Sequence, residues 1–396
     1  MSPSLRVLVV ATKSPWPPVG GGSVALHALL TALTGAGMGV TLVAPGTVTR
    51  DDTAAGYRVR VVPVAPRTWA AVAPHLAFGL PAAVARFRLP LLQRAVEDEV
   101  AALAPDVLHL EQLHLAWMLP ALVPVVPVVL RQQNVESLLL RRLARLRRAP
   151  LSWLLRREAA RLADLEKRAC RTAHVVAAIS AVDAGRLREL APGASVTSLP
   201  VPFAATAPAA GAPLAGDPPL VALGSFDWAP NRDGVSWFLR TVWPGLHRQV
   251  PNAVLHLAGP GSDTLVSPHC PAVVCHGVVP STGELLDPRG IVLVPLRAGS
   301  GVRVRILEAW AAEIPVVTTP VGGEGLVAGD GDGAALAETA QSFVAAVAAL
   351  AADASLRSRL VARGRERLAD HDPRRVAAAA RDLYLQAIAA AGRRRS

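Results

Sequence analysis

The sequence predicts an α/β protein built from two Rossmann-like, doubly wound domains, and three observations predict it. The chain has 396 residues, more than one ordinary hydrophobic core accommodates. Strand-like and helix-like segments alternate through both halves, as in parallel sheets covered by helices on both faces. The alternation stops over a Pro-, Ala- and Gly-rich stretch between Pro200 and Pro219. We therefore expect an N-terminal domain over 1–205, a linker over 206–218, a C-terminal domain over 219–372 and a final helix over 373–396.

In the first half, short apolar runs rich in Val and Leu predict buried strands, and amphipathic segments predict helices. The helix that follows the first strand ends on Gly35, a residue typical of helix C-termini. The predicted strands cover 6–11, 40–44, 57–64, 106–110, 125–130, 175–179 and 196–199. The predicted helices cover 23–35, 91–103, 137–171 with a break near Pro150, and a short stretch from Ala181.

The second half repeats the same alternation after the linker. The predicted strands cover 220–224, 254–258, 273–276, 291–295 and 315–318. The predicted helices cover 234–249 and 302–312, and the tail is helical to about Ala390. Open parallel sheets bind ligands at the carboxyl ends of their strands, so we expect a ligand site there, facing a gap between the domains.

Composition limits the classes of partner. Hydrophobic residues make up 52% of the chain and aromatic residues only 4%, so the cores consist mainly of Ala, Val and Leu. The formal net charge is +11, and Lys13 and Lys167 are the only lysines, so the positive charge is almost all arginine. Arginine suits phosphate oxygens, which favours phosphate-bearing substrates or an anionic membrane surface. Neither aromatic platforms nor a recognition helix accompanies the basic run, so we expect no nucleic-acid partner.

The sequence shows neither a leader nor a spanning segment. The chain runs directly into its first strand without a cleavable signal pattern. Its most apolar stretch, 119–130, is too short to span a bilayer and contains three prolines. We expect a cytoplasmic protein, either soluble or peripheral on the inner face of the membrane.

Two cysteines, Cys270 and Cys275, are flanked by His269 and His276, which raises the idea of a zinc site. A short buried strand over 272–275 explains the pattern better, because alternate residues of a strand point to opposite faces. We therefore expect no metal and reduced thiols.

The first candidate motif, Gly20-Gly21-Gly22, lies between the first strand and its helix. Glycines there let backbone N–H groups approach an anion at a helix N-terminus. With Ala25 the motif also fits G-x-G-x-x-A, but it starts well after the strand, and the second strand ends without a carboxylate for a ribose. A dehydrogenase is therefore disfavoured, and a flexible turn and an anion-binding loop both remain open.

The second candidate motif runs over 298–309 (AGSGVRVRILEA), where a glycine-rich turn follows a strand and opens a helix. Such a turn is an anion site by geometry. Arg303 and Arg305 fall in the first helical turn, where cations oppose the helix dipole unless an anion joins them. Glu308 follows, and its carboxylate suits the hydroxyls of a ribose. An ion pair from Glu308 to Arg303 or Arg305 is the alternative.

These motifs resemble the GT-4 family of retaining glycosyltransferases, which have the GT-B fold. The segments that carry the resemblance are 224–234, 299–312 and 315–326, and more loosely 20–22 and 130–136. The resemblance implies two domains that face each other across a cleft, a final helix that returns to the N-terminal domain, a nucleotide-diphosphate sugar as donor, a hydroxyl acceptor, retention of configuration, and neither metal nor cofactor.

The resemblance also implies roles for residues. Glu308 binds the donor ribose, Arg303 and Arg305 meet the diphosphate as catalytic cations, and 322–326 lie against the phosphates or the sugar. The predicted donor-binding residues are Gly20, Gly21, Gly22, Ser225, Asn231, Gly299, Ser300, Gly301, Glu308, Gly322, Gly323, Glu324, Gly325 and Leu326. The predicted acceptor-side residues are Glu111, Arg131, Gln133, Asn134 and Glu136.

The leaving phosphate can itself take the acceptor's proton, so a protein base is optional. His114 and Glu111 are candidate bases near the end of a strand, and this role is slightly favoured over that of plain surface residues. His109 is expected inside the core. The chain departs from the family at Ser300, where a glutamate is usual, at Gln133, where a histidine is usual, and at Glu313, where a glycine is usual. A non-catalytic nucleotide-sugar-binding protein and a sugar-nucleotide epimerase of the same fold therefore remain alternatives.

The basic helical region over 137–171 interleaves arginines with leucines and Trp153. It could lie on anionic lipid headgroups. The alternative, which the sequence favours somewhat, is an amphipathic helix that packs its leucines on the sheet. A lipid-linked glycan and a small-molecule natural product are both open as acceptors.

Overall fold

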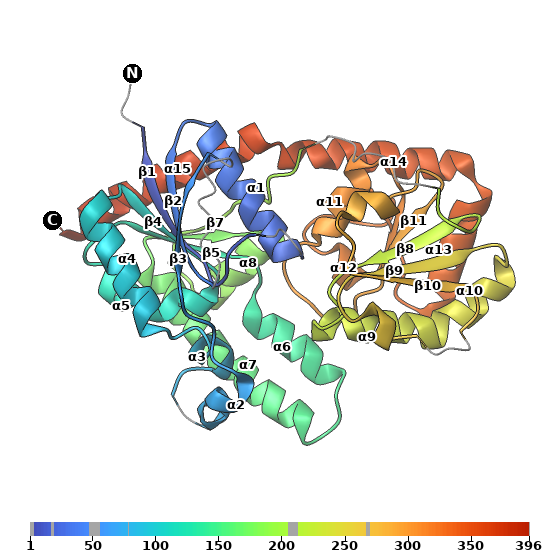
Figure 1. Ribbon diagram of the computed structural model, residues 1–396, viewed down its shortest axis with the longest axis horizontal. Coiled ribbons are helices and arrows are strands. Elements are labelled where there is room, and N and C mark those ends of the chain that lie inside the picture. The colour runs from blue at the N-terminus through green and yellow to red at the C-terminus, as the bar shows by residue number, and fades with distance from the viewer. Residues whose placement is uncertain are drawn as a thin grey trace. The chain divides into compact units, whose positions relative to one another are not determined.

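The computed structural model describes residues 4–16, 20–46, 56–77, 79–204, 213–266 and 270–395. The chain divides into two compact units, each with its own sheet (Figure 1). The N-terminal unit comprises residues 1–202 together with 373–396, and the C-terminal unit comprises residues 203–372. Most of the predicted linker over 206–218 lies outside the described residues, which resume at 213.

The N-terminal unit contains a parallel sheet of seven strands in the order β3-β2-β1-β4-β5-β6-β7. The strands are β1 Arg6–Val10, β2 Gly39–Pro45, β3 Arg58–Val62, β4 Val107–Glu111, β5 Val128–Gln132, β6 Val175–Ala178 and β7 Val196–Ser198. The fifth strand begins three residues later than predicted, after Pro127, and Val125 is exposed.

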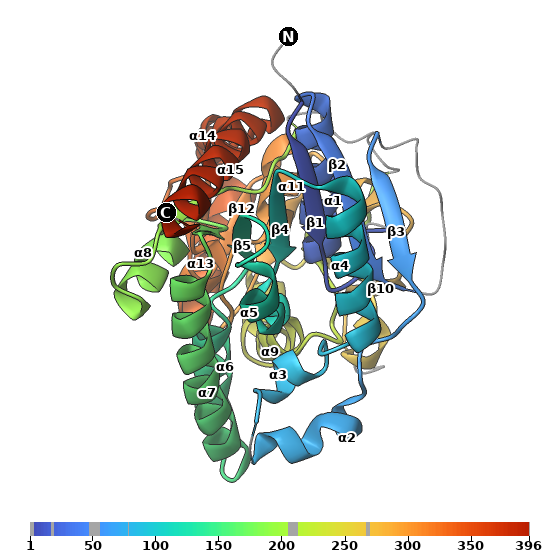
Figure 2. The ribbon, with the colours of Figure 1, turned by 90° about the vertical axis from the view of Figure 1, so that its left-hand side faces the viewer.

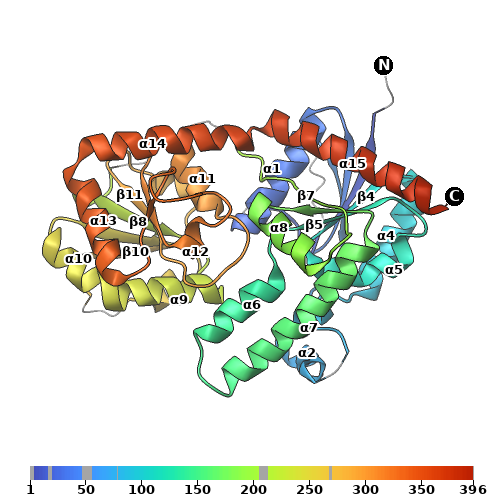
Figure 3. The same ribbon diagram turned by 180° about the vertical axis from the view of Figure 1, so that it is seen from behind.

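Helices cover both faces of this sheet because its strands are apolar on both sides. Leu8 and Val10 of β1 pack with α4 and α7, whereas Val7 and Val9 pack with α1 and α15. Figure 2 looks onto this unit, and Figure 3 shows α15 beside its strands. The helices are α1 Gly21–Gly35, α2 Trp69–Val72, α3 Ala82–Ala85, α4 Pro90–Leu103, α5 Leu119–Leu122, α6 Glu136–Arg145, α7 Leu151–Thr172, α8 Ala181–Leu190 and α15 Pro373–Arg395, with 3-10 turns η2 Ala73–Leu76 and η3 Leu113–Met118.

The C-terminal unit contains a parallel sheet of six strands in the order β10-β9-β8-β11-β12-β13. The strands are β8 Pro219–Leu223, β9 Val254–Ala258, β10 Val273–Gly277, β11 Ile291–Val294, β12 Val316–Thr318 and β13 Ala335–Leu336. The prediction of a buried strand near Cys275 was wrong. β10 is an edge strand with only one neighbour, so Val274 and Cys275 are exposed.

The helices of this unit are α9 Ala229–Trp237, α10 Trp243–Gln249, α11 Val304–Ala311, α12 Pro320–Gly323, α13 Ala340–Ala352 and α14 Ala354–Leu368, with a π turn Phe238–Val242 and 3-10 turns Ser262–Thr264, Thr282–Leu285 and Ala369–His371. α9 begins five residues before the predicted start at Gly234. Pro230 lies in its first turn, where a missing N–H costs nothing. In the described parts of the chain no helix is both long and apolar enough to cross a bilayer.

Candidate functional site

In the C-terminal unit, the strand order reverses between β8 and β11, which are neighbours at the centre of the sheet. From β8 the chain proceeds outward to β9 and β10, and from β11 it proceeds to the other side. The loops that leave the two strands therefore diverge and open a crevice at their carboxyl ends. A pocket lies there, lined by the ends of β8 and β11, by Asn231 and Gly234 of α9, and by Arg305 of α11.

Two glycines allow the backbone to close around this pocket. A Cβ on Gly234 would collide with the carbonyl oxygen of Pro295, so only glycine lets α9 pack onto the end of β11. Gly224 has a φ of 150° and directly follows β8. A Cβ there would collide with the guanidinium of Arg305 and lie 2.9 Å from Asn231 Nδ2. Gly224 thus leaves the space that Arg305 occupies.

Arg305 lies in the first turn of α11 and lines the pocket. It makes no hydrogen bond and no ion pair with the described residues. Burial lowers the pKa of Arg305, and the charge of Glu308 only partly opposes this effect. A guanidinium remains charged at any ordinary pH, so the pocket contains a positive charge that lacks a partner at the start of a helix.

Glu308 follows Arg305 by three residues on α11 and is half-buried. Burial raises the pKa of Glu308, while Arg305 and a hydrogen bond from Thr282 oppose the rise. Thr282 Oγ1 donates to Glu308 Oε1 over 3.3 Å. The described residues contain no direct ion pair between Glu308 and either Arg303 or Arg305, although the charge of Arg305 acts on Glu308 and opposes the rise of its pKa.

Arg303 differs from its predicted place. It is the N-cap of α11 rather than part of the first turn, and it is only 6% exposed. Its Nη2 donates to the carbonyl oxygens of Ser300 and, over 3.1 Å, of Gly301. The guanidinium lies 5.8 Å from the centre of the Trp228 ring. Arg303 therefore fastens the glycine turn, in which Gly299, Ser300 and Gly301 are all buried.

Ser225 and Asn231 also take part in internal contacts. The side chain of Asn231 is 5% exposed and donates from Nδ2 to the carbonyl oxygen of Ser225 over 2.8 Å. This bond fixes the loop that leaves β8 against the first turn of α9.

The predicted sugar- or phosphate-binding segment 322–326 follows the third strand of the site, β12. Thr319 caps α12 by accepting from Gly322 N over 2.9 Å. A Cβ on Gly322 would lie 2.6 Å from the carbonyl oxygen of Val294, so the turn packs directly on the end of β11. Gly323 and Leu326 are buried, and Glu324 and Gly325 are half-buried.

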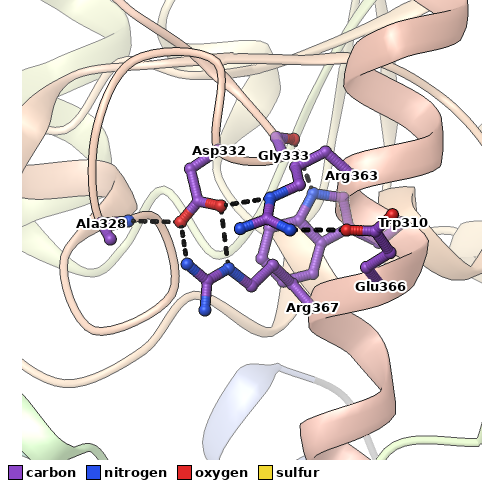
Figure 4. A network of polar contacts seen from close by, with 7 residues as sticks. All are labelled: Trp310, Ala328, Asp332, Gly333, Arg363, Glu366 and Arg367. Atoms are coloured by element: carbon purple, nitrogen blue, oxygen red, sulfur yellow. Dashed lines mark hydrogen bonds and ion pairs between the residues drawn. The ribbon is translucent and has the colours of Figure 1, made fainter.

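The loop that continues from this segment is anchored on α14 (Figure 4). Asp332 Oδ1 accepts from Arg363 Nε over 2.8 Å and from Arg367 Nε over 2.9 Å, and Oδ2 accepts from Ala328 N over 3.1 Å. The hydrogen bond from Arg367, with smaller contributions from Ala328 and Arg363, lowers the pKa of Asp332 to about 2. Trp310 of α11 donates from Nε1 to Gly333 O over 2.7 Å. The loop is thus bound both by α11, through Trp310, and by α14, through Arg363 and Arg367.

The N-terminal unit also reverses its strand order, between β1 and β4. Gly20 is the N-cap of α1 with a φ of 88°, and Gly21 and Gly22 form its first turn. A Cβ on Gly22 would lie 3.1 Å from Gln133 Oε1. Gln133 accepts from Gln112 Nε2 over 3.2 Å, and Gln112 accepts from Thr12 Oγ1 over 2.7 Å. The glycine turn and Gln133 therefore lie next to each other. Neither of the two sequence motifs by itself predicts this contact.

The expectation that Glu111 and Arg131 face an acceptor needs correction. Both are buried, at 1% and 0% exposure, because β4 and β5 are central strands. Arg131 Nη1 donates to Glu111 Oε1 over 2.9 Å, and Gln133 Nε2 donates to the same oxygen over 2.8 Å. Burial alone would raise the pKa of Glu111, but Arg131, His109 and Gln133 together lower it to about 2.

His109 is a core residue, as predicted. Its Nε2 lies 2.9 Å from Glu111 Oε2, and its Nδ1 lies 2.7 Å from the hydroxyl of Tyr384 on α15. The place of Tyr384 could not be predicted, since nothing local to the final helix shows that it reaches a histidine 275 positions away. We call Glu111, Arg131, His109, Gln133 and Tyr384 the buried polar network.

The remaining acceptor-side residues are spread along the first turns after β4 and β5. His114 in η3 is half-buried, its ring centre lies 5.1 Å from that of Phe87, and its buried Nδ1 has no hydrogen-bond partner among the described residues. Asn134 Nδ2 donates to Glu136 Oε1 over 3.1 Å. Glu136 N donates to Glu166 Oε1 over 2.6 Å, so Asn134 and Glu136 shape the start of α6.

No cluster of three or more His, Cys, Asp or Glu residues suited to a metal ion occurs in the described ranges. His269, part of the zinc idea, lies outside the described residues.

Residues 217–353 match the family model of Glycosyl transferases group 1. No curated protein matches the sequence. Among solved structures the chain is similar to a sucrose-phosphate synthase from Thermosynechococcus elongatus, with a TM-score of 0.77, 19% identity, and coverage of 98% of this chain and 100% of that one. It is also similar to HepE from Anabaena in complex with UDP, with a TM-score of 0.63, 13% identity, and coverage of 96% and 99%. A third is the pneumococcal O-GlcNAc transferase GtfA in complex with UDP and GlcNAc, with a TM-score of 0.68, 9% identity, and coverage of 97% and 99%.

The shared fold confirms the predicted α/β class, with two parallel, helix-covered sheets as in GT-B glycosyltransferases. The match over 217–353 covers the pocket, Arg305 and Glu308, and supports the resemblance to group 1 glycosyltransferases.

Proposed function

We propose that the protein is a glycosyltransferase that moves a sugar from a nucleotide-diphosphate donor to a hydroxyl acceptor. The observation that carries the proposal is Arg305, a half-buried guanidinium that lines a pocket at the reversal of the strand order and makes no hydrogen bond or ion pair with the described residues. A buried charge is costly unless it is paired, so a site that keeps one open is suited to an anion. Several structures of the same fold contain UDP.

The proposed step needs little acid–base chemistry from the protein. The bond between the anomeric carbon and the donor phosphate oxygen breaks, and the acceptor oxygen forms a new bond to that carbon. Negative charge develops on the leaving diphosphate, where Arg305 and the backbone N–H groups that start α11 and α12 stabilise it. The acceptor proton passes to a phosphate oxygen of the leaving group. We propose retention of configuration and no metal or other cofactor.

Glu308 is proposed to accept hydrogen bonds from the donor ribose, because it lies one turn after Arg305 on α11 and pairs with no cation. Gly299, Ser300 and Gly301 serve the site as a packed turn, which Arg303 holds in place. The cation that meets the diphosphate is therefore Arg305, and Arg303 positions the turn.

On the acceptor side, Gln133 contacts both the glycine turn at Gly22 and Glu111 of the buried polar network. It therefore lies where the strand order of the N-terminal sheet reverses. A neutral amide that both donates and accepts suits a sugar hydroxyl. We retain His114 as the candidate that assists the acceptor, since its Nδ1 lacks a partner among the described residues.

The test is turnover. The purified chain is mixed with UDP-, GDP- and dTDP-sugars and a panel of hydroxyl acceptors, and both the nucleoside diphosphate and the glycosylated product are measured. We expect Glu308→Gln to weaken donor binding about 10-fold or more, the worth of a hydrogen bond to a charged group. Glu313→Gln is the matched control, because Glu313 is exposed and pairs with Arg365 away from the pocket.

Several outcomes would overturn the proposal. Tight donor binding without product would identify a non-catalytic nucleotide-sugar-binding protein, and a donor that changes without an acceptor would identify an epimerase. Equal donor affinity of Glu308→Gln and the parent chain would remove the ribose assignment.

A further inference from the structure

The N-terminal unit exposes apolar side chains at one end, where two segments far apart in sequence meet. Of the eight tryptophans in the chain, only Trp69 and Trp153 are exposed, at 59% and 61%. Leu76, Leu151 and Leu154 are exposed at 40%, 47% and 36%. Trp69 and Leu76 belong to α2 and η2, and the other three begin α7. In Figures 1, 2 and 3 α2 and the start of α7 lie at the same end of this unit.

Hydrogen bonds from α7 hold the two segments together. Arg157 Nη2 donates to Ala77 O over 2.8 Å. Arg161 Nη2 donates to Gly79 O over 2.7 Å, and its Nη1 donates to His75 O. Leu154 precedes Arg157 by three residues on the same helix, so it lies beside the segment that carries Leu76. We call this surface, formed by residues 67–77 and 145–157, the basic tip.

The amphipathic packing expected for 137–171 holds only for part of this region. On α7 the buried side chains begin at Glu158 and continue through Leu162, Leu165 and Ala169. The first two turns of the helix extend past this packed face, and Leu151, Trp153 and Leu154 meet solvent instead. Burying exposed apolar area is favourable, so this surface is suited to a partner with an apolar phase.

The charge of the basic tip is of one sign. The sequence contains no Asp or Glu over 53–96 or over 137–157. Arg145, Arg148 and Arg156 are exposed and make no ion pair with the described residues. Tryptophan and leucine beside unpaired arginines form the pattern of proteins that rest in a membrane interface, where apolar side chains enter the acyl boundary and cations meet headgroups.

We propose that the basic tip docks the protein on an anionic phospholipid membrane. Two basic tips repel each other, so a second copy of the chain does not fit the charge. A nucleic acid could stack on Trp69 and Trp153, but it would leave the exposed Leu76, Leu151 and Leu154 in water, so it fits the apolar part less well than a membrane does. The proposal goes beyond the transfer reaction and does not depend on it, because membrane binding and turnover are measured separately.

The test is co-sedimentation of the full chain with vesicles of phosphatidylcholine containing about one third phosphatidylglycerol, and with vesicles of phosphatidylcholine alone. We expect binding to the anionic vesicles only, and weaker binding at high salt. The pair Arg148→Gln and Arg156→Gln should weaken binding about 25-fold, since one basic residue near an anionic surface contributes about fivefold. The pair Trp69→Ser and Trp153→Ser should weaken it at least about tenfold.

Matched controls test whether binding depends on the basic tip or only on the protein's overall charge and exposed apolar surface. Arg240→Gln with Arg248→Gln removes two exposed arginines elsewhere, and Leu385→Ser removes an exposed leucine of α15. Both should leave binding unchanged, and all variants should keep the parent's thermal unfolding temperature because every replaced side chain is exposed or lies on the surface.

Three results would overturn the proposal. The first is absence of co-sedimentation at low salt. The second is equal loss in the control variants. The third is retention of vesicle binding by the tryptophan variant together with tight binding of a single-stranded oligonucleotide that the arginine variant loses, which would identify a nucleic-acid surface instead.

Discussion

Replacing Arg305 by methionine should stabilise the free protein and weaken donor binding, two effects of opposite sign. Arg305 is a half-buried charge without an ion pair among the described residues, and partial burial lowers the pKa of its guanidinium. Methionine has similar length and no charge, so the substitution removes the desolvation cost. Replacement of fully buried charges by apolar side chains is worth about 1–4 kcal/mol in other proteins, so the gain at half-buried Arg305 should be at the lower end, about 1 kcal/mol.

The expected change in Tm depends on the size of the unit that contains Arg305. The C-terminal unit spans residues 203–372. In a domain of this size each kcal/mol raises Tm by about 2–4 °C. The loss of Arg305 also removes a charge-assisted hydrogen bond to the diphosphate, worth about 1.5–3 kcal/mol, or about 10- to 150-fold in affinity. The variant should therefore melt higher than the parent and show little further shift when UDP is added.

Arg303→Met is the matched control, because Arg303 lies two residues away and bonds to its own turn. Its Nη2 donates to Ser300 and Gly301, so its removal should lower Tm instead. Differential scanning fluorimetry with and without UDP, followed by calorimetric titration, measures both effects. A lower Tm for Arg305→Met combined with unchanged UDP affinity would refute the reasoning, since Arg305 would then be a structural cation.

Three further predictions concern the N-terminal unit. Arg131→Met leaves Glu111 buried without its guanidinium and should cost about 3–5 kcal/mol in urea unfolding, with part of the loss recovered when Glu111→Gln is added. Tyr384→Phe removes one hydroxyl from the buried polar network and should cost about 0.5–1.5 kcal/mol in the same assay, without affecting UDP binding. Burial raises the pKa of Glu166 to about 8 from 4.5, so the folded state keeps a proton that the unfolded chain releases. Unfolding free energy should then fall as pH rises from about 4.5 to 8 and level off above, and Glu166→Gln, compared across this range, should remove that fall.

The fold was predictable because its signals are local. Buried parallel strands read as short apolar runs, and Pro150 divides the basic helical region into α6 and α7 as expected. The exposure of a strand was less predictable, since β10 has the apolar composition of a central strand and only the sheet order places it at an edge. The start of α9 was also predicted too late, because Pro230 is compatible with a first helical turn although the residues around it show no helical pattern.

The sequence predicted which residues form the candidate site, but it did not predict which contacts each of them makes. Glycine-rich turns and the cations after them follow from the sequence, and Arg305 and Glu308 lie where a pocket forms. Whether a guanidinium faces a ligand or its own backbone depends on which carbonyl oxygens the turn presents. Arg303 donates to the turn, whereas Arg305 does not. Glu111 was misplaced for a related reason, since the sequence around it does not show that β4 lies between two other strands.

The contrast between Arg303 and Arg305 bears on why both arginines are needed for the proposed chemistry. A turn of three buried residues cannot keep its N–H groups aimed at a ligand unless something binds its carbonyl oxygens, and Arg303 does so from the N-cap of α11. Those hydrogen bonds direct Nη2 of Arg303 at the turn rather than at the pocket, although they go to neutral carbonyl oxygens and leave the charge of the guanidinium in place. Arg305 is left with its charge open because Gly224 gives it space and no carboxylate in the described chain pairs with it. A lysine at 303 should therefore preserve charge but lose the planar contact to two carbonyl oxygens, and impair the turn more than a lysine at 305 impairs the pocket.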